Sequence, residues 1–346
     1  MNTGNWRLPA EWEKQKGVLL CFPHNGNDWP GKFQAVQWAF VEFIKKIASF
    51  EEVHIVIASE KLKNRLLEML ARNHVKLERI SFIFQKTNRS WMRDSGPIIV
   101  TKGREKKALD FNFRGWSKYN NYFLDRQVPV AVAGHLGLEL ERVVFKGKPV
   151  SIEGGAIEVN GKGTLLATEE CLLDPEIQVR NPGMTKSDYE NLFEEYLGVK
   201  NVIWLSKGIA GDDTHGHTDD LTRFVNASTL VTVVEENRDD ENYKALQQNL
   251  DLLKRSYLED GSRPTIVSLP MPQPIIFEGL RIPASYANFL IINQAVLVPT
   301  FNDPNDRIAL NLLDACFPDR EVIGISAVDL IWGFGTLHCL SQQIPE

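Results

Sequence analysis

The sequence has few cysteines and no long apolar run. Its four cysteines, Cys21, Cys171, Cys316 and Cys339, are widely spaced and form no CxxC pair, so neither a disulfide framework nor a cysteine-rich zinc site is indicated. No apolar stretch approaches the roughly 20 residues needed to cross a bilayer, and the first residues lack an apolar run of signal-peptide length. We therefore expect a cytoplasmic protein without a membrane partner.

Basic residues are fewer than acidic ones. The chain has 39 lysines and arginines against 45 aspartates and glutamates, which gives a formal net charge of −6 and a pI near 5.8. This balance argues against a nucleic-acid partner and is compatible with a small cationic ligand. With 346 residues, of which 43% are hydrophobic, the chain is long enough for one large core or two ordinary domains.

What the sequence does contain is a set of short apolar strands that come in pairs. Three pairs are predicted to turn at Asn160-Gly161, Asn226-Ala227 and Asn293-Gln294. A fourth pair, in residues 96–113, is predicted to have a longer loop. Such pairs are typical of antiparallel hairpins.

Amphipathic helices follow several of these hairpins, and each helix leads into a further strand. Residues 185–198 begin with a capping box from Thr185 to Asp188 and end at Gly198, before a strand at 201–206. Residues 305–317 and 237–261 show the same helical spacing before strands. The repeating unit is therefore strand, strand, helix, strand.

The two ends of the chain complement each other. The last strand, "GTLHCLSQQ", lacks the rest of its unit, and the first, "GVLLCFPHN", lacks a hairpin partner but is followed by a helix and a strand. Joining them completes a fifth unit. We predict an α/β fold of five ββαβ modules in a ring closed by the N- and C-terminal strands, forming one domain over residues 1–346.

Ring closure brings together the residues at the start of each hairpin, and these are polar. They are Asp94, Glu153, His217, Asp219, the segment 285–288 and Cys339. We expect His217 and Asp219 to lie on one strand, where side chains two residues apart point to the same face.

A thiol near an imidazole is a suitable nucleophile, because imidazole moves protons near neutral pH. Nearby carboxylates, however, raise the pKa of a thiol and disfavour the thiolate. They suit a substrate that brings its own positive charge, and a guanidinium pairs with carboxylates through two parallel hydrogen bonds. Asp94 and Asp219 would then hold a guanidinium with its carbon towards Cys339.

The motifs that carry these residues resemble those of the agmatine deiminase family, relatives of bacterial peptidylarginine deiminases in the guanidino-group-modifying superfamily. They are "WMRDSGP", "EGGAIEVNGKGTLLATEECLL", "RNP", "GDDTHGHTDDLTRF", "PASYANF" and "GTLHCLSQQ". The resemblance runs in family order from "LPAEWEKQKGVLLCFPHN" to the final "QQIP". It implies a five-bladed α/β propeller, the pentein fold.

The resemblance also implies roles for single residues. Cys339 is the nucleophile, His217 the general acid and base, Asp94 and Asp219 bind the guanidinium, and Glu153 supports the histidine and the substrate nitrogens. Trp91 matches an aromatic residue that lines the pocket. The implied reaction converts agmatine and water to N-carbamoylputrescine and ammonia through a covalent thiouronium, as in putrescine biosynthesis, without a metal or cofactor.

For some residues the sequence allows two interpretations. Asp212 and Asp213 either form a turn or meet the distal ammonium of agmatine, and of the two we assign Asp213 to the substrate. His215 and His338 are interpreted as structural or supporting residues, as is Arg93. Phe334 stands where the family usually has a glycine, so we expect it to affect substrate entry or loop motion.

Three alternatives remain open. Free or peptidyl arginine would replace agmatine if a cationic residue such as Arg114, Arg180 or Arg281 lay at the pocket mouth. A zinc hydrolase could use His215 and His217 as ligands, but the other histidines are dispersed. A propeller that only binds its ligand would lack one of the catalytic positions. A homo-oligomer is compatible with the sequence.

Overall fold

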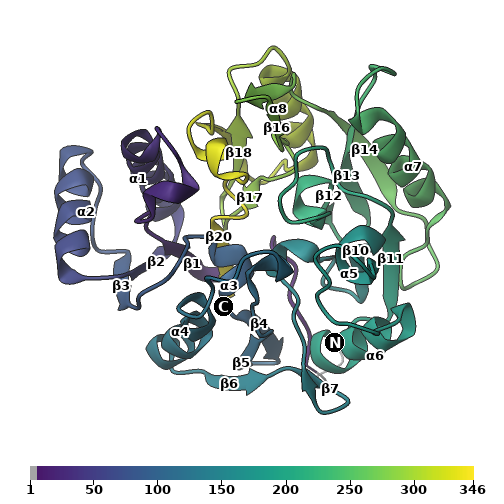
Figure 1. Cartoon of the computed structure of the whole chain (residues 1–346), viewed down its shortest axis with the longest axis horizontal. Helices are drawn as coiled ribbons and strands as arrows, with labels where there is room; N and C mark the ends of the chain where they lie inside the picture. The colour runs from purple at the N-terminus through teal and green to yellow at the C-terminus, as the bar shows by residue number, and fades with distance from the viewer. Residues whose placement is uncertain (1–5) are drawn as a thin grey trace.

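The protein has an α/β fold, with sheets of mixed parallel and antiparallel strands and with helices on the outside. The computed structural model describes residues 6–346, and residues 1–5 of the predicted domain lie outside them. Within the described part, the strands form five sheets of three or four strands and two two-stranded ribbons. Figure 1 shows the sheets arranged around the middle of the molecule, with helices towards the periphery. Among residues 6–346, no helix combines the length and apolar composition needed to cross a bilayer.

One sheet contains both ends of the chain, as predicted. Its order is β20-β1-β2-β3, with bounds Ser341–Pro345, Gln15–Cys21, Glu52–Ile57 and Ile80–Phe84. β20 runs antiparallel to β1, and β2 runs parallel to it. The helix predicted after β1 is α1 (Phe33–Phe50), whereas α2 (Glu60–Arg72) and β3 form an addition that the repeat did not predict.

The other four sheets share one plan, in which an antiparallel hairpin is extended by a third, parallel strand. In chain order they are β4 (Ile98–Lys102), β5 (Glu105–Asp110) and β6 (Glu139–Arg142); β9 (Glu158–Val159), β10 (Thr164–Thr168) and β11 (Asn201–Leu205); β12 (Thr222–Asn226), β13 (Thr229–Val234) and β14 (Thr265–Pro270); β17 (Leu290–Ile291), β18 (Ala295–Thr300) and β19 (Glu321–Ser326). The ribbons are β7 (Val144–Phe145) with β8 (Lys148–Pro149) and β15 (Ile275–Phe277) with β16 (Leu280–Ile282).

A helix precedes the third strand of each of these sheets. These helices are α4 (Val128–Leu136), α5 (Glu169–Leu173), α6 (Lys186–Leu197), α7 (Asn242–Arg255) and α8 (Asn305–Cys316). In α6 the side chain of Thr185 accepts from the N–H of Asp188, and the Asp188 side chain accepts from the N–H of Thr185. The capping box is therefore confirmed, as is the end at Gly198, which adopts φ 69°.

The hairpin in residues 96–113 was wrongly predicted to have a long loop. Lys102 pairs with Glu105, so only Gly103 and Arg104 connect β4 to β5. Gly103 adopts φ 61°, the left-handed conformation that such a tight turn requires. The lysine-rich β5 is nonetheless a regular strand, because its pairing with β4 and β6 outweighs the weak strand preference of lysine.

Short helical turns precede the first strands of three sheets. They are α3 (Met92–Ser95) before β4, η4 (Gly154–Ala156) before β9 and η5 (Thr218–Asp220) before β12. The prediction that His217 and Asp219 share a strand is therefore wrong, because β12 begins only at Thr222. The turns, rather than strand alternation, aim the polar side chains.

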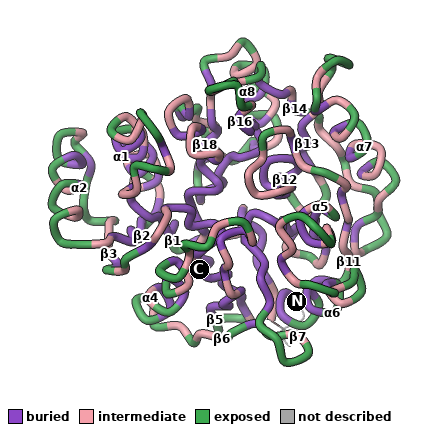
Figure 2. Tube along the Cα trace, in the orientation of Figure 1, coloured by how far each residue is buried: buried purple, intermediate pink, exposed green. Residues whose placement is uncertain are grey.

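The apolar core lies between the sheets and the helices that cover them. Figure 2 shows that the strands in the middle of the molecule are largely buried, while the outer faces of α2, α6 and α7 are exposed. Among the largest fully buried side chains are Arg180 and Arg223, which are charged. Charged side chains therefore lie in the interior of the protein.

Candidate active site

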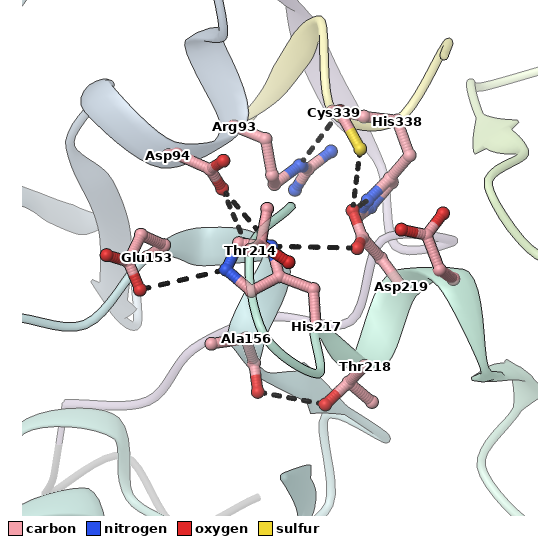
Figure 3. A network of polar contacts seen from close by, with 12 residues as sticks. Arg93, Asp94, Glu153, Ala156, Thr214, His217, Thr218, Asp219, His338 and Cys339 are labelled. Carbon is pink, nitrogen blue, oxygen red and sulfur yellow. Dashed lines mark hydrogen bonds and ion pairs between the residues drawn. The ribbon is translucent and has the colours of Figure 1, made fainter. Parts of the chain in front are cut away.

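The polar residues predicted at the hairpin starts do lie together. Asp94 lies on α3, Glu153 directly before η4, His217 directly before η5, Asp219 within η5, and Cys339 in the turn before β20. All five are buried. Figure 3 shows the side chains of Asp94, Glu153, His217, Asp219 and Cys339 directed towards a common centre.

The thiol of Cys339 is enclosed by hydrogen-bonding groups. Asn288, in the segment 285–288 also predicted to converge here, donates from Nδ2 to Sγ at 3.0 Å, and the thiol donates to Oδ2 of Asp219 at 3.6 Å. Burial raises the pKa of this thiol well above its ordinary value, and the charges of Asp219, Asp220 and Asp94 raise it further. The ligand-free site therefore favours the neutral thiol.

His217 has carboxylates on two sides but touches none closely. Its Nδ1 lies 3.8 Å from Asp94 and 4.0 Å from Asp219, and its Nε2 lies 3.7 Å from Glu153. Among residues 6–346, neither ring nitrogen has a hydrogen-bond partner. Burial alone lowers the pKa of His217, but Asp94, with Cys171 and Glu153, raises it well above its ordinary value. The imidazole is therefore charged and free to change partners.

The two aspartates differ in which oxygens are occupied. Asp94 accepts from Nε1 of Trp116 at 2.8 Å and from the N–H of Gly155 at 3.2 Å, and burial raises its pKa to about 6. Asp219 accepts from His338 through Oδ2 at 2.7 Å. Its Oδ1 is buried and meets no donor in the part of the chain that is described. A buried acceptor 4.0 Å from Nδ1 of His217 is thus left for a ligand.

Glu153 is held from behind by an arginine. Nε of Arg180 lies 3.1 and 3.3 Å from the two carboxylate oxygens of Glu153, and both residues are buried. Burial alone would raise the pKa of Glu153, but Arg180 and His217 lower it to about 2. Arg180 is therefore a support for Glu153, and it is not the cationic group at the pocket mouth that an enzyme for arginine would need.

The two glycines after Glu153 allow this crowding. A Cβ atom at Gly154 would lie 2.4 Å from the carbonyl oxygen of Arg93. One at Gly155 would lie 2.5 Å from Nδ1 of His217 and 3.1 Å from oxygens of both Asp94 and Asp219. Any side chain at Gly155 would therefore enter the space between the imidazole and the carboxylates.

A cavity of about 200 Å³ leads from the surface to Asp94 and Cys339. Its walls are largely aromatic, formed by Trp91, Trp116, Tyr119 and Phe334. Trp91, which the sequence predicted as a pocket residue, packs against Trp29 with ring centroids 5.3 Å apart. Polar and charged residues, among them Asp28, Arg89 and Asp213, share the walls with these aromatic side chains.

Asp212 and Asp213 lie in different environments. Asp212 accepts from the backbone N–H groups of Thr214, Gly216 and His217, as expected for a turn. Asp213 lines the cavity, where it pairs with Lys118 at 2.6 Å and accepts from the hydroxyl of Tyr119 at 2.8 Å.

Phe334 lines the same cavity and has an unusual backbone. It adopts φ 69°, a left-handed conformation that favours glycine. Its neighbours Gly333 and Gly335 have no room for a Cβ atom, since each such atom would lie 2.9 Å from the ring of Trp91. The segment therefore presses its backbone against Trp91 and extends only the phenylalanine ring along the cavity.

The histidines of the "HGH" segment do not share a site. His215 pairs with Asp174 at 2.9 Å, whereas His217 faces Asp94 and Glu153. Two other groups bring possible ligand atoms within 4.8 Å of one another: Glu153 with Cys171 and His217, and Asp219 with Asp220 and Cys339. The zinc alternative as predicted, with both histidines as ligands, does not fit this geometry. The buried Cys171 lies beside His217.

The two other arginines considered for the pocket mouth have partners elsewhere. Arg281 pairs with Asp240 and Arg114 contacts the carbonyl of Arg180, and neither lines the cavity as described over residues 6–346. Arg89 does line it, close to Asp28 at 3.8 Å and over the ring of Tyr119 at 4.3 Å. The signal for Arg89 was its place two residues before Trp91.

The fold defines the class of the protein, because solved deiminase structures share it over nearly the whole chain. A solved structure provisionally described as a peptidyl-arginine deiminase is 35% identical, has a TM-score of 0.89 and covers 100% of both chains. A C. jejuni agmatine deiminase with one cysteine replaced by serine and substrate bound is 30% identical, has a TM-score of 0.87 and covers 99% of this chain and 96% of its own.

Sequence comparison identifies the family. The model of Porphyromonas-type peptidyl-arginine deiminases matches residues 7–345. The agmatine deiminase of Pseudomonas aeruginosa (strain LESB58) is 31% identical over 365 residues, which cover 98% of this chain and 95% of that one. The chain belongs to the Porphyromonas-type peptidyl-arginine deiminase family, and within it to the agmatine deiminases.

Proposed function

We propose that this chain is a hydrolase that converts agmatine and water to N-carbamoylputrescine and ammonia. Its family and its curated relatives support this activity. The single observation that carries it is the buried Oδ1 of Asp219, which lies 4.0 Å from Nδ1 of His217 and finds no donor among residues 6–346, while Oδ2 of the same carboxylate accepts from the thiol of Cys339. A substrate guanidinium supplies such donors.

Asp94 and Asp219 bind the guanidinium from two sides. The group has five N–H donors in a plane and pairs with carboxylates through parallel hydrogen bonds. Its positive charge lowers the pKa of Asp94 from about 6, so both carboxylates are ionised when substrate is bound. Held in this way, the guanidinium carbon lies towards Sγ of Cys339.

Cys339 forms a bond to that carbon as the thiolate. In the ligand-free site the surrounding carboxylates raise the pKa of the thiol. The bound cation offsets those charges and favours loss of the thiol proton to solvent, while Asn288 donates a hydrogen bond to the sulfur. The thiolate therefore forms when substrate is present, as we infer from the charges that surround the thiol.

His217 protonates the leaving nitrogen. Its raised pKa keeps it in the charged, acidic form, and its unpartnered nitrogens leave it free to reach the reacting atoms. The C–N bond breaks, ammonia leaves, and a thiouronium on Cys339 remains. Neutral His217 then takes a proton from water, which attacks the same carbon, and the C–S bond breaks to give the urea product and the thiol.

The distal ammonium of agmatine meets carboxylates at the outer part of the cavity. Asp213 is one, as the sequence suggested, although Lys118 already neutralises it. Asp28 is the other: it lines the cavity and its Oδ2 lacks a donor within the described chain. The methylene chain of agmatine lies between the aromatic walls of Trp91 and Phe334.

Butylguanidine tests this subsite, because it retains the guanidinium and the chain but lacks the ammonium. Asp28→Asn and Asp213→Asn should raise KM for agmatine and leave KM for butylguanidine unchanged. Equal effects on both substrates would contradict a role for these carboxylates in binding the ammonium.

An enzyme for free or peptidyl arginine is the nearest alternative. Its substrate would bring a carboxylate or peptide group to Arg89, the arginine that lines the cavity. Arg89 is already engaged by the backbone and side-chain oxygens of Asn121 and by Asp28. A kcat/KM for arginine above that for agmatine, lowered selectively by Arg89→Gln, would favour this alternative.

We further propose that the five sheets are the blades of an α/β propeller of the pentein type, formed by residues 1–346 as one domain. The shared hairpin-and-third-strand plan and the pairing of β20 with β1 support this arrangement. A cytoplasmic location, a role in putrescine biosynthesis and a homo-oligomeric state stay predictions.

The test of the function is ammonia release from agmatine in excess chelator, for the wild type and for Cys339→Ser. We expect rapid release that only the substitution abolishes. A wild type that becomes active only when zinc is added would favour a metal hydrolase, with the Glu153, Cys171 and His217 cluster as its first candidate site. A wild type inactive in both conditions would contradict agmatine as the substrate.

A further inference from the structure

A second histidine, His338, lies directly behind the thiol and is held tightly on both sides. Its Nδ1 lies 2.7 Å from Oδ2 of Asp219, and its Nε2 lies 2.8 Å from Oε2 of Glu11. All three residues are buried. Glu11 belongs to the segment before β1, far from Asp219 in the sequence, so this chain of contacts exists only in the folded protein.

These contacts define the charge of His338. An ionised carboxylate only accepts hydrogen bonds, so each ring nitrogen must carry a hydrogen. Burial by itself raises the pKa of both carboxyl groups, but Arg223 and His338 lower that of Glu11, and His338 lowers that of Asp219. Both carboxyl groups are therefore ionised, and the imidazole between them is a cation.

The surrounding charges are balanced around Glu11. Its Oε2 also lies 3.3 Å from Nη2 of Arg93 and 3.1 Å from Nη2 of Arg223, which pairs in turn with Glu158 at 3.0 Å. The Nε of Arg93 donates to the carbonyl of His338. With Asp219 and His338, three cations face three carboxylates.

Glu11 is also anchored to a different sheet. Its Oε1 accepts from the N–H of Ile291 on β17 at 2.6 Å. One carboxylate thus connects the segment before β1 with α3, β12, β17 and the turn that carries the thiol. Because few of these groups can move alone, the position of His338 is defined by several elements at once.

We propose that His338 and Glu11 are positioning residues that hold Asp219 ionised, with its free oxygen aimed at the substrate. This inference rests on the proposed function, in which Asp219 binds the guanidinium. Without a cation on Oδ2, burial beside Asp220 and Asp94 would favour protonation of Asp219, and Oδ1 would lose its charge and its direction.

The charge of His338 can be observed directly by ¹⁵N NMR of the imidazole in the wild type. We expect the chemical shifts of a ring that carries a hydrogen on both nitrogens, one donated to Asp219 and one to Glu11. A ring with one hydrogen at neutral pH would overturn the proposal, whatever the activity of the enzyme.

The role of Glu11 is tested with Glu11→Gln against Glu158→Gln as the matched control. Both substitutions remove a buried carboxylate that pairs with Arg223, but only Glu11 contacts His338. We expect kcat/KM for agmatine to fall about tenfold or more in Glu11→Gln, the effect of losing one charge-assisted hydrogen bond. The control should lose less activity than Glu11→Gln, because Glu158 does not contact His338.

The pH profile separates positioning from a general loss of stability. Removing the cation raises the pKa of Asp219, so the acid limb of kcat/KM should move to higher pH in Glu11→Gln and in His338→Gln, and not in Glu158→Gln. Equal losses in Glu11→Gln and the control, or an unmoved acid limb, would overturn the proposal. An inactive wild type with a doubly protonated His338 would instead refute only the proposed reaction.

Discussion

The two buried histidines on either side of Asp219 are held in opposite ways. Nδ1 of His217 lies 4.0 Å from Oδ1 of Asp219, whereas Nδ1 of His338 lies 2.7 Å from Oδ2 of the same carboxylate. The ring of His217 has no hydrogen-bond partner among residues 6–346, and the ring of His338 has two. A loosely held imidazole can exchange protons, while a tightly held one acts as a permanent charge.

The largest effect should come from removing the loosely held histidine. His217→Gln should lower kcat for agmatine by about 10²–10⁴-fold, the usual contribution of a general acid and base. The variant should still bind agmatine, because Asp94 and Asp219 remain. Steady-state ammonia release measures kcat, and isothermal titration measures binding. A loss below tenfold would mean that His217 does not move the proton and that the contrast with His338 has no catalytic meaning.

The second-largest loss of kcat/KM should follow from crowding the ring of His217. The new Cβ in Gly155→Ala would lie 2.5 Å from Nδ1, so the ring must shift away from the reacting atoms. A displacement of this kind costs about 10²-fold in kcat/KM. Gly134→Ala is the control, because its Cβ would meet nothing within 4 Å. Full activity of Gly155→Ala would show that His217 need not sit where it does.

The pH dependence of alkylation tests whether the carboxylates around Cys339 control the pKa of its thiol. Burial and the carboxylates raise the pKa of Cys339, so alkylation by iodoacetamide without ligand should accelerate only above the ordinary pKa of a free thiol, about 8.5. A bound guanidinium lowers that pKa, so in His217→Gln an added guanidine compound should move the profile to lower pH. Full reactivity below neutral pH without ligand would contradict a thiolate that depends on the substrate.

The smallest effect should come from Phe334, which touches neither histidine. Phe334→Gly relieves a left-handed backbone, worth about 1 kcal/mol, but adds flexibility in the unfolded chain that offsets part of this gain. The free energy of unfolding in urea should therefore change by less than about 1 kcal/mol. Losing one aromatic wall should raise KM for agmatine by less than about tenfold. A changed pH profile would show that Phe334 influences the histidines after all.

Local features of the fold could be predicted because they depend on neighbours in the sequence. The capping box of Thr185 and Asp188, the end of α6 at Gly198 and the turn before Thr229 all join residues a few positions apart. The repeat of these local units then predicted the pairing of β20 with β1. Errors arose where a short loop had no clear turn signal, as between Lys102 and Glu105.

Prediction failed where the position of a polar residue depends on contacts with residues far away in the sequence. His217 and Asp219 were expected to converge through strand alternation, and they do lie near each other, but on a short helical turn. Arg180 was one of three arginines that the sequence could not place, and it lies behind Glu153. Arg89 and Asp28 drew no attention, because neither residue lies in a motif by itself.

The sequence by itself determined which reactive groups the protein carries and that the starts of its hairpins meet. Only the tertiary structure decided which histidine is free and which is fixed, because that depends on Glu11 reaching His338 from the other end of the chain. Hydrogen bonds depend on differences of about 1 Å, as between 2.7 and 4.0 Å at Asp219. Such differences arise from the packing of several sheets together, and no local pattern of residues contains them.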